Sequence, residues 1–352
     1  MGSFKDYNFR GRKAILRVDF NVPLNKETFE ITDDKRMQAA LPTINKIISD
    51  GGSVIILSHL GRPKNGPEES FSLIHLTDHL EKITGRKVLF ANDCIGEEAE
   101  LLAQKLNPGE ILLLENVRFH KEETKGDHRF AKQLANLGDC YVNDAFGTAH
   151  RAHSSTTHIA SYFTGENKMC GLLMEAEIKS AKKVMEETQR PFTAIVGGAK
   201  VSDKVLIVEN LMKTADHIII GGGMAYTFKK ALGGEIGDSL CENERIETCK
   251  DILSKANRLG VSIHLPLDSV IADKFSTDAQ TRTAKSDEIL QNWMGLDIGP
   301  LATEQFSKII EESKTILWNG PMGVFELKPF EEGTKSIASA VAKATEKGAY
   351  SL

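Results

Sequence analysis

The chain has 352 residues with a net charge of −5, and 41% of them are hydrophobic, which is enough for two domains with large buried cores. A slightly acidic chain has no overall attraction for nucleic acid or anionic membranes, and no uncharged apolar run approaches the roughly 20 residues of a membrane span, so we expect neither partner. Five scattered cysteines without a Cys-x-x-Cys pair argue against a disulfide framework, and no signal-peptide core is visible, so the expected compartment is the cytoplasm.

The first half of the chain alternates short apolar segments with amphipathic ones. Strands are expected at 13–18, 53–57, 87–90, 110–114 and 140–142, and helices at 33–50, 72–84, 96–106 and 127–137. Segment 110–114 is almost wholly apolar, as a central parallel strand buried on both faces should be. Regular alternation of strand and helix predicts an α/β fold with a doubly wound, mostly parallel sheet.

Polar and basic side chains follow the ends of these strands. They are Asp19 and Asn21 after the first strand, His59 and Arg62 after the second, Arg118 and His120 after the fourth, and His150, Arg151 and His153 after the fifth. Arg36 lies in the first turn of a helix, where a cation opposes the helix dipole and is better explained by an anionic ligand. Open α/β sheets bind ligands at the carboxyl ends of their strands, so converging guanidinium groups indicate a small polyanion, a phosphate or a carboxylate. The alternative is that these arginines form scattered ion pairs with nearby acids.

A long, charged, amphipathic segment at 171–190 separates this series from a second one and is expected to be a connecting hinge helix. The predicted organisation is therefore a first domain at 1–170, the connecting helix at 171–190 and a second domain at 191–352. Both domains are expected to be doubly wound, mostly parallel sheets with Rossmann-like topology.

The second series opens with an apolar strand at 192–196 and a glycine pair at 197–198 that lets the backbone turn sharply. Ser202 and Asp203 are of the residue types that cap a helix, here expected at 205–214. With Lys200 and Lys204 nearby, the turn suits a phosphate, although an ordinary strand-to-helix turn with two solvated lysines is the alternative. The stretch is not a Walker A loop.

Two further glycine-rich strand ends follow in the second half. A strand at 216–220 runs into Gly221-Gly222-Gly223, where Tyr226 takes the place of a third glycine, so no Rossmann fingerprint is present. The loop at 319–326 follows a strand at 315–318 and suits a clamp for a ribose and a base. Segment 292–300 is expected to be a shaped loop, and Asp268 and Asp273 are assigned to turns or caps in preference to catalysis. The remaining expected elements are helices at 242–259, 303–313 and 330–346 and strands at 262–265, 266–272 and from 349.

Taken together, these motifs resemble the phosphoglycerate kinase family over the whole chain. The matching stretches are Arg-Val-Asp-Phe-Asn-Val-Pro at 17–23, Ser-His-Leu-Gly-Arg-Pro at 58–63, Glu-Asn-Val-Arg-Phe-His at 115–120, the run at 142–155, Gly-Gly-Ala-Lys-Val at 197–201, Gly-Gly-Gly-Met-Ala at 221–225 and Trp-Asn-Gly-Pro at 318–321. The family transfers a phosphoryl group reversibly between 1,3-bisphosphoglycerate and ADP, giving 3-phosphoglycerate and ATP in glycolysis.

The resemblance implies a role for each matching residue. Residues that would hold 3-phosphoglycerate are Asp19, Asn21, Arg36, His59, Arg62, Arg118 and Arg151, and those that would hold the nucleotide are Lys200, Lys204, Gly221, Gly222, Gly295, Asn319, Pro321 and Glu326. Arg36 and Lys200 would neutralise the phosphoryl group during transfer. The resemblance also implies Mg²⁺ bound with ATP or ADP, and a monomer whose two domains close about a hinge.

In other family members the chain continues past the strand at 350 into a Gly-Gly-Gly-Asp-Thr loop that holds the phosphates and Mg²⁺, and that loop is not in this sequence. No protein ligand for Mg²⁺ is therefore expected in this chain. Two functions remain open at this point: an active kinase, or a shortened, weakly active or inactive relative that binds 3-phosphoglycerate but does not bind nucleotide productively. A nicotinamide-dependent dehydrogenase is disfavoured by the absent fingerprint.

Overall fold

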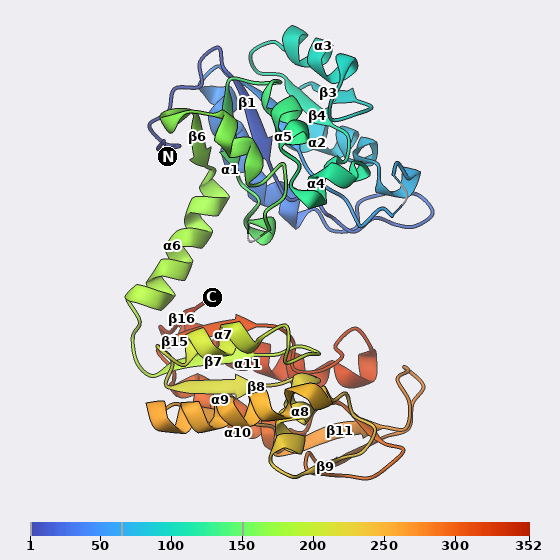
Figure 1. Ribbon diagram of the computed structural model, residues 1–352, viewed down its shortest axis with the longest axis vertical. Coiled ribbons are helices and arrows are strands. Elements are labelled where there is room, and N and C mark those ends of the chain that lie inside the picture. Colours follow the sequence, from blue (N-terminus) through green and yellow to red (C-terminus); the bar gives the residue numbers. More distant parts are fainter. Residues whose placement is uncertain (1, 65, 150) are drawn as a thin grey trace. The chain divides into compact units, whose positions relative to one another are not determined.

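The computed structural model describes residues 2–64, 66–149 and 151–352. The chain divides into two compact units, Met1–Lys179 and Ser180–Leu352, and each has its own sheet and hydrophobic core. Helix α6, Leu172–Glu186, is a single continuous helix that includes the point of division (Figure 1).

The first unit is built on a six-stranded parallel sheet in the order β3-β4-β2-β1-β5-β6. Its strands are β1 Lys13–Arg17, β2 Ser53–Leu57, β3 Val88–Ala91, β4 Ile111–Leu114, β5 Cys140–Asn143 and β6 Lys168–Cys170. All the residues of β2 and β4 are buried, as expected for central strands covered on both faces. The sheet confirms the predicted α/β architecture, and β6 adds an edge strand that the sequence pattern did not indicate.

Alternating side chains of these strands enter two separate cores. Leu16, Ile56 and Leu113 pack with residues of α1 and α2, whereas Ile15, Ile55 and Leu112 pack with residues of α3 and α5. The helices of this unit are α1 Lys35–Ser49, α2 Thr77–Thr84, α3 Glu97–Lys105, α4 Lys121–Lys125 and α5 His128–Ala135. The period of two in the strands therefore places helices on both faces of the sheet.

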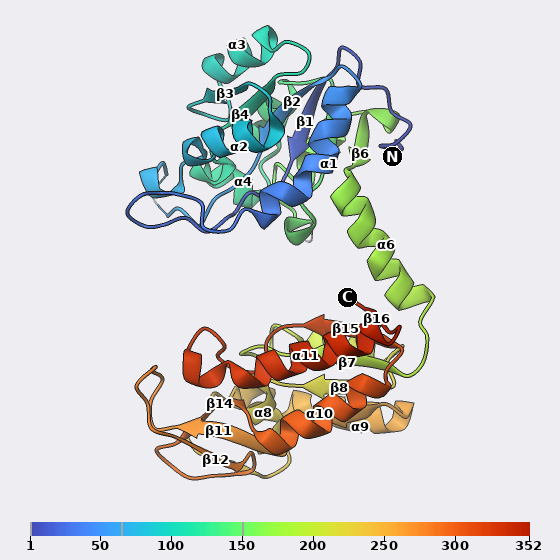
Figure 2. The same ribbon diagram turned by 180° about the vertical axis from the view of Figure 1, so that it is seen from behind.

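The second unit repeats this plan with a five-stranded parallel sheet in the order β10-β8-β7-β15-β16. Its strands are β7 Phe192–Val196, β8 His217–Ile220, β10 Ser262–His264, β15 Thr315–Asn319 and β16 Tyr350–Ser351. Its helices are α7 Val205–Leu211, α8 Met224–Ala231, α9 Ile246–Leu259, α10 Pro300–Glu312 and α11 Glu332–Glu346. Helices α7, α8 and α9 cover one face, and Figure 2 shows α10 and α11 together on the other.

A small antiparallel sheet extends the second unit. It has the order β12-β11-β14, with β11 Asp268–Ala272, β12 Thr281–Lys285 and β14 Met294–Ile298, and a short pair joins β9 Glu235–Ile236 to β13 Glu288–Ile289. Segment 292–300 was expected to be a loop, and this expectation is wrong because β14 occupies most of it. Asp268 follows the expected capping role, since its carboxylate accepts hydrogen bonds from the backbone nitrogens of Leu301 and Ala302 at the start of α10.

Candidate active site

In the first unit, the polar residues that follow the strands come together at one edge of the sheet. Strands β4, β2, β1 and β5 are consecutive neighbours and run parallel, so the loops after them leave the sheet side by side. Asp19, His59, Arg118 and Arg151 are carried by these four loops. The register of the sheet thus brings together residues that are more than 100 positions apart in the sequence.

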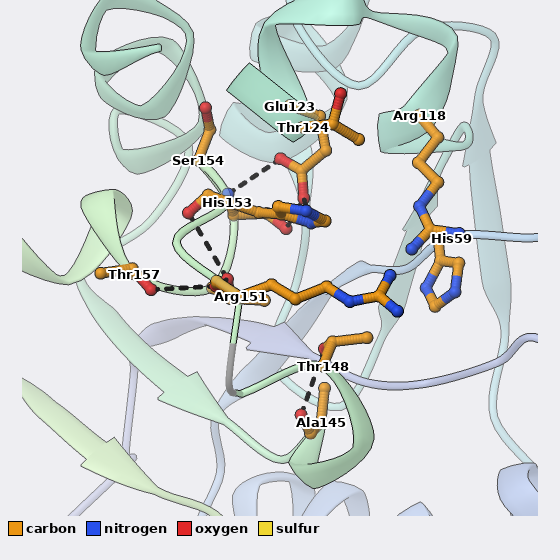
Figure 3. Close-up of polar contacts among 12 residues, drawn as sticks. His59, Arg118, Glu123, Thr124, Ala145, Thr148, Arg151, His153, Ser154 and Thr157 are labelled. Atoms are coloured by element: carbon orange, nitrogen blue, oxygen red, sulfur yellow. Dashed lines mark hydrogen bonds and ion pairs between the residues drawn. The ribbon is translucent and has the colours of Figure 1, made fainter. Parts of the chain in front are cut away.

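Positive charge accumulates at this edge of the sheet. Burial, followed by the charges of Arg17, Arg118, Arg36 and Arg151, lowers the pKa of His59 to about 2, so the imidazole is neutral. Burial and the nearby guanidinium groups of Arg17, Arg151 and Arg62 also lower the pKa of Arg118 to about 10. Figure 3 shows the side chains of Arg118 and Arg151 directed toward the His59 ring. The positive charges of this cluster repel one another, and a multiply charged anion bound among them would reduce this repulsion.

His59 is held in one tautomer by its neighbour. Nη2 of Arg17 lies 3.4 Å from Nδ1 of His59, and a guanidinium group can only donate, so Nδ1 is the acceptor. The proton of the neutral ring is then on Nε2, which leaves an N–H group that can donate to a ligand.

Arg36 and Asp19 form an ion pair at the same edge. Nη1 of Arg36 lies 2.8 Å from Oδ2 of Asp19, and the Arg36 side chain keeps 52% of its surface exposed. The alternative that the arginines pair with nearby acids is therefore partly correct for Arg36, which has one such partner. Within residues 2–64, 66–149 and 151–352, neither Arg62 nor Arg118 forms an ion pair with a carboxylate.

The loop after β2 is fastened to its neighbours through one glycine. Oδ1 of Asn21 accepts a hydrogen bond from the backbone nitrogen of Gly61 at 2.7 Å, and Nη1 of Arg118 donates to the carbonyl oxygen of Gly61 at 2.8 Å. Gly61 has a φ of +61°, a conformation that other residues rarely adopt. These contacts set the position of Arg62, the next residue, which is exposed.

A buried polar network supports this edge, and the sequence analysis missed it. Nε of Arg17 donates to Oγ of Ser155 at 2.8 Å, and that hydroxyl donates to Oε1 of Glu123 at 2.6 Å. Glu123 also accepts from the backbone nitrogen of Ser155 at 2.9 Å, and its carboxylate lies 3.8 Å from Nδ1 of His153 (Figure 3). The one available signal was Arg17, a charged residue that directly follows the apolar residues 14–16 of β1.

Two other predicted basic positions have different outcomes. Nε2 of His120 hydrogen-bonds Oδ1 of Asp93 at 2.7 Å. His150 lies outside the described residues.

In the second unit, a cavity of about 480 Å³ opens beside the ends of β7, β8 and β15. Four of the predicted nucleotide residues line it: Gly222, Gly295, Pro321 and Glu326. Leu240, Phe275 and Met294 give it an apolar wall. A mostly apolar hollow with a few polar groups is typical of a small-molecule site.

Glycines allow three backbones to meet at this cavity. The backbone nitrogen of Gly197 donates to the carbonyl of Asn319 at 2.9 Å, and that of Gly222 donates to the carbonyl of Met322 at 2.9 Å. Gly222 has a φ of +69°, and a Cβ atom there would lie 2.6 Å from the carbonyl oxygen of Gly198. A Cβ atom on Gly295 would collide with the hydroxyl of Tyr226, which is buried and donates to Oγ of Ser269 at 2.9 Å.

The remaining predicted nucleotide residues lie around this cavity in different ways. Nζ of Lys204 hydrogen-bonds Oδ1 of Asn319, and its Cε lies 3.4 Å from the Cβ position of Gly198 in the cavity wall. Lys200 is exposed. Gly221 packs against Met322, where a Cβ atom would meet the sulfur.

The predicted capping of the helix after β7 is wrong. The residue that precedes α7 is Lys204, and no side chain caps this helix. Ser202 instead donates from its backbone nitrogen and its hydroxyl to the carboxylate of Glu242, at 3.0 and 2.6 Å.

An acidic group with an unusual pKa borders the cavity. The carboxylate of Asp297 is buried and accepts hydrogen bonds from the backbone nitrogens of Ile298 and Gly333, at 2.9 and 2.7 Å. Burial raises the pKa of Asp297 to about 7 despite these two bonds. This carboxyl group is therefore partly protonated near neutral pH.

Comparison with known proteins decides between the functions that the geometry leaves open. Residues 4–352 match the family described as phosphoglycerate kinase. The chain belongs to the phosphoglycerate kinase family. It is 49% identical to phosphoglycerate kinase of Porphyromonas gingivalis, covering 99% of this chain and 89% of that protein, and 47% identical to the cytosolic phosphoglycerate kinase of Nicotiana tabacum, covering 100% and 87%.

A solved structure agrees with the sequence matches. Phosphoglycerate kinase from Coxiella burnetii superposes with a TM-score of 0.80 at 40% identity, covering 99% of this chain and 86% of that one. This similarity confirms the predicted fold class. The function is that of a phosphoglycerate kinase, a phosphotransferase of glycolysis, and the comparisons do not favour a binding protein without kinase activity. No helix in the described part of the chain has the length and apolar character to cross a membrane.

Proposed function

We propose that this kinase transfers a phosphoryl group reversibly between 1,3-bisphosphoglycerate and ADP, with 3-phosphoglycerate held by the first unit and Mg-nucleotide by the second. The assignment of 3-phosphoglycerate to the first unit rests on the convergence of guanidinium groups beside a neutral His59. A ligand with both a phosphate and a carboxylate has enough negative charge to relieve their mutual repulsion.

In the first unit, the basic residues bind the two charged ends of the glycerate. The proposed contacts are Asp19, Asn21, Arg36, His59, Arg62, Arg118 and Arg151. Asp19 is an acceptor beside Arg36 and is suited to a ligand hydroxyl, whereas Nε2–H of His59 donates to an anionic oxygen. Arg17 touches no ligand in this proposal and holds the edge through Ser155.

In the second unit, the cavity receives the base and ribose, and the phosphates lie toward the lysines. The proposed contacts are Lys200, Lys204, Gly221, Gly222, Gly295, Asn319, Pro321 and Glu326. The apolar wall formed by Leu240 and Phe275 suits a flat base, and the Glu326 carboxylate can accept hydrogen bonds from ribose hydroxyls. Gly222, by lacking a Cβ atom, lets its backbone approach that of Gly198 closely, and this contact shapes the wall of the cavity.

In this proposal Mg²⁺ arrives with the nucleotide, and no residue of this chain is assigned to it as a ligand. Magnesium takes most of its ligands from phosphate oxygens and water in such sites, and it neutralises the charge of the phosphates. Lys204, already bonded to Asn319, lies where its ammonium group can reach a phosphate beside Gly198.

Phosphoryl transfer depends on positioning and on charge stabilisation, so the protein needs no covalent intermediate. Arg36 and Lys200 are the proposed groups that neutralise the transferred phosphoryl group. Because each ligand is assigned to a different unit, turnover also requires the units to close about the helix at 171–190, which excludes water from the acyl phosphate. We further propose that the enzyme acts as a monomer in the cytoplasm.

Binding and turnover can be measured separately. Calorimetric titrations with 3-phosphoglycerate and with Mg-ADP should each show one site, and ATP formation from 1,3-bisphosphoglycerate should require both. Arg36→Met should lower turnover by about 10³-fold or more, following the effect of removing an arginine from such a transition state. Arg86→Met, at an exposed position between α2 and β3, is the control. Equal turnover of the two variants would remove Arg36 from the catalytic role.

A further inference from the structure

A second cluster of reactive side chains lies in the first unit, outside both groups of ligand-binding residues. Asp93, Cys94 and His120 have ligand atoms that all lie within 4.8 Å of one another, and they are the one such trio in the described part of the chain. We propose that these three side chains form a binding site for a divalent transition-metal cation of the Zn²⁺ type.

The sheet brings the three residues together. Asp93 and Cys94 follow β3, and His120 follows the turn after β4. Strands β3 and β4 are parallel neighbours, with Ala91 opposite Leu114, so both loops leave the same end of the sheet. The ligands therefore come from two loops that are anchored by adjacent strands.

The present spacing is close to what a tetrahedral cation needs. Zinc bonds of about 2.0–2.3 Å to oxygen, nitrogen and sulfur place neighbouring ligand atoms about 3.3–3.6 Å apart in tetrahedral geometry. Oδ1 of Asp93 and Nε2 of His120 are 2.7 Å apart and would have to separate slightly. The sulfur of Cys94 lies within 4.8 Å of both atoms and would have to move by up to about 1.5 Å to reach the tetrahedral spacing.

The chemistry of the ligands selects the class of cation. A thiolate, an imidazole and a carboxylate together suit Zn²⁺ or Co²⁺, whereas Mg²⁺ prefers oxygen ligands alone. Binding would release the thiol proton of Cys94 to solvent, together with the proton that Asp93 and His120 share. The Mg²⁺ that accompanies the nucleotide is therefore not expected to compete for this site.

Burial leaves one side of the cluster accessible. The Cys94 side chain is buried, while the Asp93 and His120 side chains expose 49% and 25% of their surface. A cation can enter from the solvent side and keep water as its remaining ligand. The His120 ring packs against Phe130 with centroids 5.0 Å apart, which limits its rotation. Supporting contacts of this kind orient metal ligands.

Two of the three groups, Asp93 and His120, are also joined by a hydrogen bond that needs no metal. The His120–Asp93 bond ties the two loops together. Metal binding must therefore be measured directly, with a readout that reports the ligands.

Cobalt titration of the full chain gives that readout. After treatment with a chelator, addition of Co²⁺ with excess Mg²⁺ present should produce the visible bands of tetrahedral cobalt and a near-ultraviolet thiolate band, with one equivalent bound. Zn²⁺ should abolish both bands by displacement. Absence of a thiolate band from the folded wild-type chain would overturn the proposal.

Variants identify the site. Cys94→Ala removes the sulfur without adding a polar group to a buried position. This variant should lose the thiolate band and bind Co²⁺ at least tenfold more weakly. His120→Asn should weaken Co²⁺ binding to a similar extent. Cys241→Ala and His264→Gln are the matched controls, because Cys241 is a partly exposed thiol and His264 pairs with His217 at 3.1 Å. If Cys94→Ala, folded by circular dichroism, keeps the band, or if either control loses it, the proposed site is wrong.

Discussion

Replacing Arg118 with methionine should weaken the binding of 3-phosphoglycerate while leaving the stability of the unliganded protein nearly unchanged. Methionine keeps most of the apolar stem of the side chain and removes its charge. The substitution therefore separates the electrostatic contribution of Arg118 from its packing.

The stability change is a difference between two small terms. The lost hydrogen bond from Arg118 to the Gly61 carbonyl should cost about 1 kcal/mol. Burial and the neighbouring Arg17 and Arg151 lower the pKa of Arg118 to about 10, and the distance from the ordinary arginine value corresponds to about 3 kcal/mol. Because the group is only half-buried and burial is the largest cause, the repulsion relieved by the substitution is nearer 1 kcal/mol. The two terms cancel approximately.

The binding change has no such compensation. A hydrogen bond between charged groups contributes about 1.5–3 kcal/mol, so the dissociation constant should rise about 10- to 150-fold. Calorimetric titration with 3-phosphoglycerate measures this, and thermal unfolding without ligand measures stability. Arg86→Met, at an exposed position, serves as the control. An unchanged dissociation constant, or a binding loss matched by an equal loss of stability, would refute the electrostatic account of the site.

Three further substitutions address the cavity and the two titrating groups. Gly222→Ala places a Cβ atom against Gly198, so the affinity for Mg-ADP should fall by at least about tenfold while 3-phosphoglycerate binding is retained; calorimetry that shows intact ADP binding would contradict the proposed cavity. The pKa of His59 is lowered to about 2, so below about pH 6.5 the unfolded chain takes up a proton that the folded chain does not. The free energy of unfolding should therefore fall by about 2 kcal/mol between pH 6.5 and 5. In urea denaturation, His59→Gln should remove most of this pH dependence. The pH dependence due to Asp297 runs in the opposite direction, because its folded pKa of about 7 lets it keep its proton where the unfolded chain loses it. The free energy of unfolding should fall by up to about 4 kcal/mol as pH rises from about 4 to 7. If Asp297→Asn shows the same dependence of stability on pH, this assignment is wrong.

The sequence was sufficient for the parallel sheets, apart from the short edge strand Lys168–Cys170, and not for the antiparallel one. Apolar strands such as Ile111–Leu114 carry a clear pattern because both their faces are covered. Strand Thr281–Lys285 is polar and mostly exposed, and Met294–Ile298 contains Gly295 and Asp297, so neither shows strand alternation. Their pairing with Asp268–Ala272 is a tertiary property that local propensity does not report.

The basic residues of the candidate site could be predicted, and the buried network that supports them could not. Arg118 and Arg151 follow strand ends, where ligand-binding residues are expected. Glu123 lies in the charged segment Lys121–Lys125 and looks like a solvated residue in sequence, yet its side chain is fully buried against Ser155. Charge alone does not show which acid of a helix faces inward, because that depends on what the fold packs against it.

The ion pair between Arg36 and Asp19 has a consequence for selectivity. In the unliganded protein Nη1 of Arg36 already pairs with the Asp19 carboxylate, so an anion that binds Arg36 as proposed competes with an existing contact. Chloride or acetate, with a single diffuse charge, gains little by this exchange, whereas a phosphate ester offers two negative charges and several oxygens in compensation. The proposed site should therefore discriminate against monovalent anions before any step of the reaction begins.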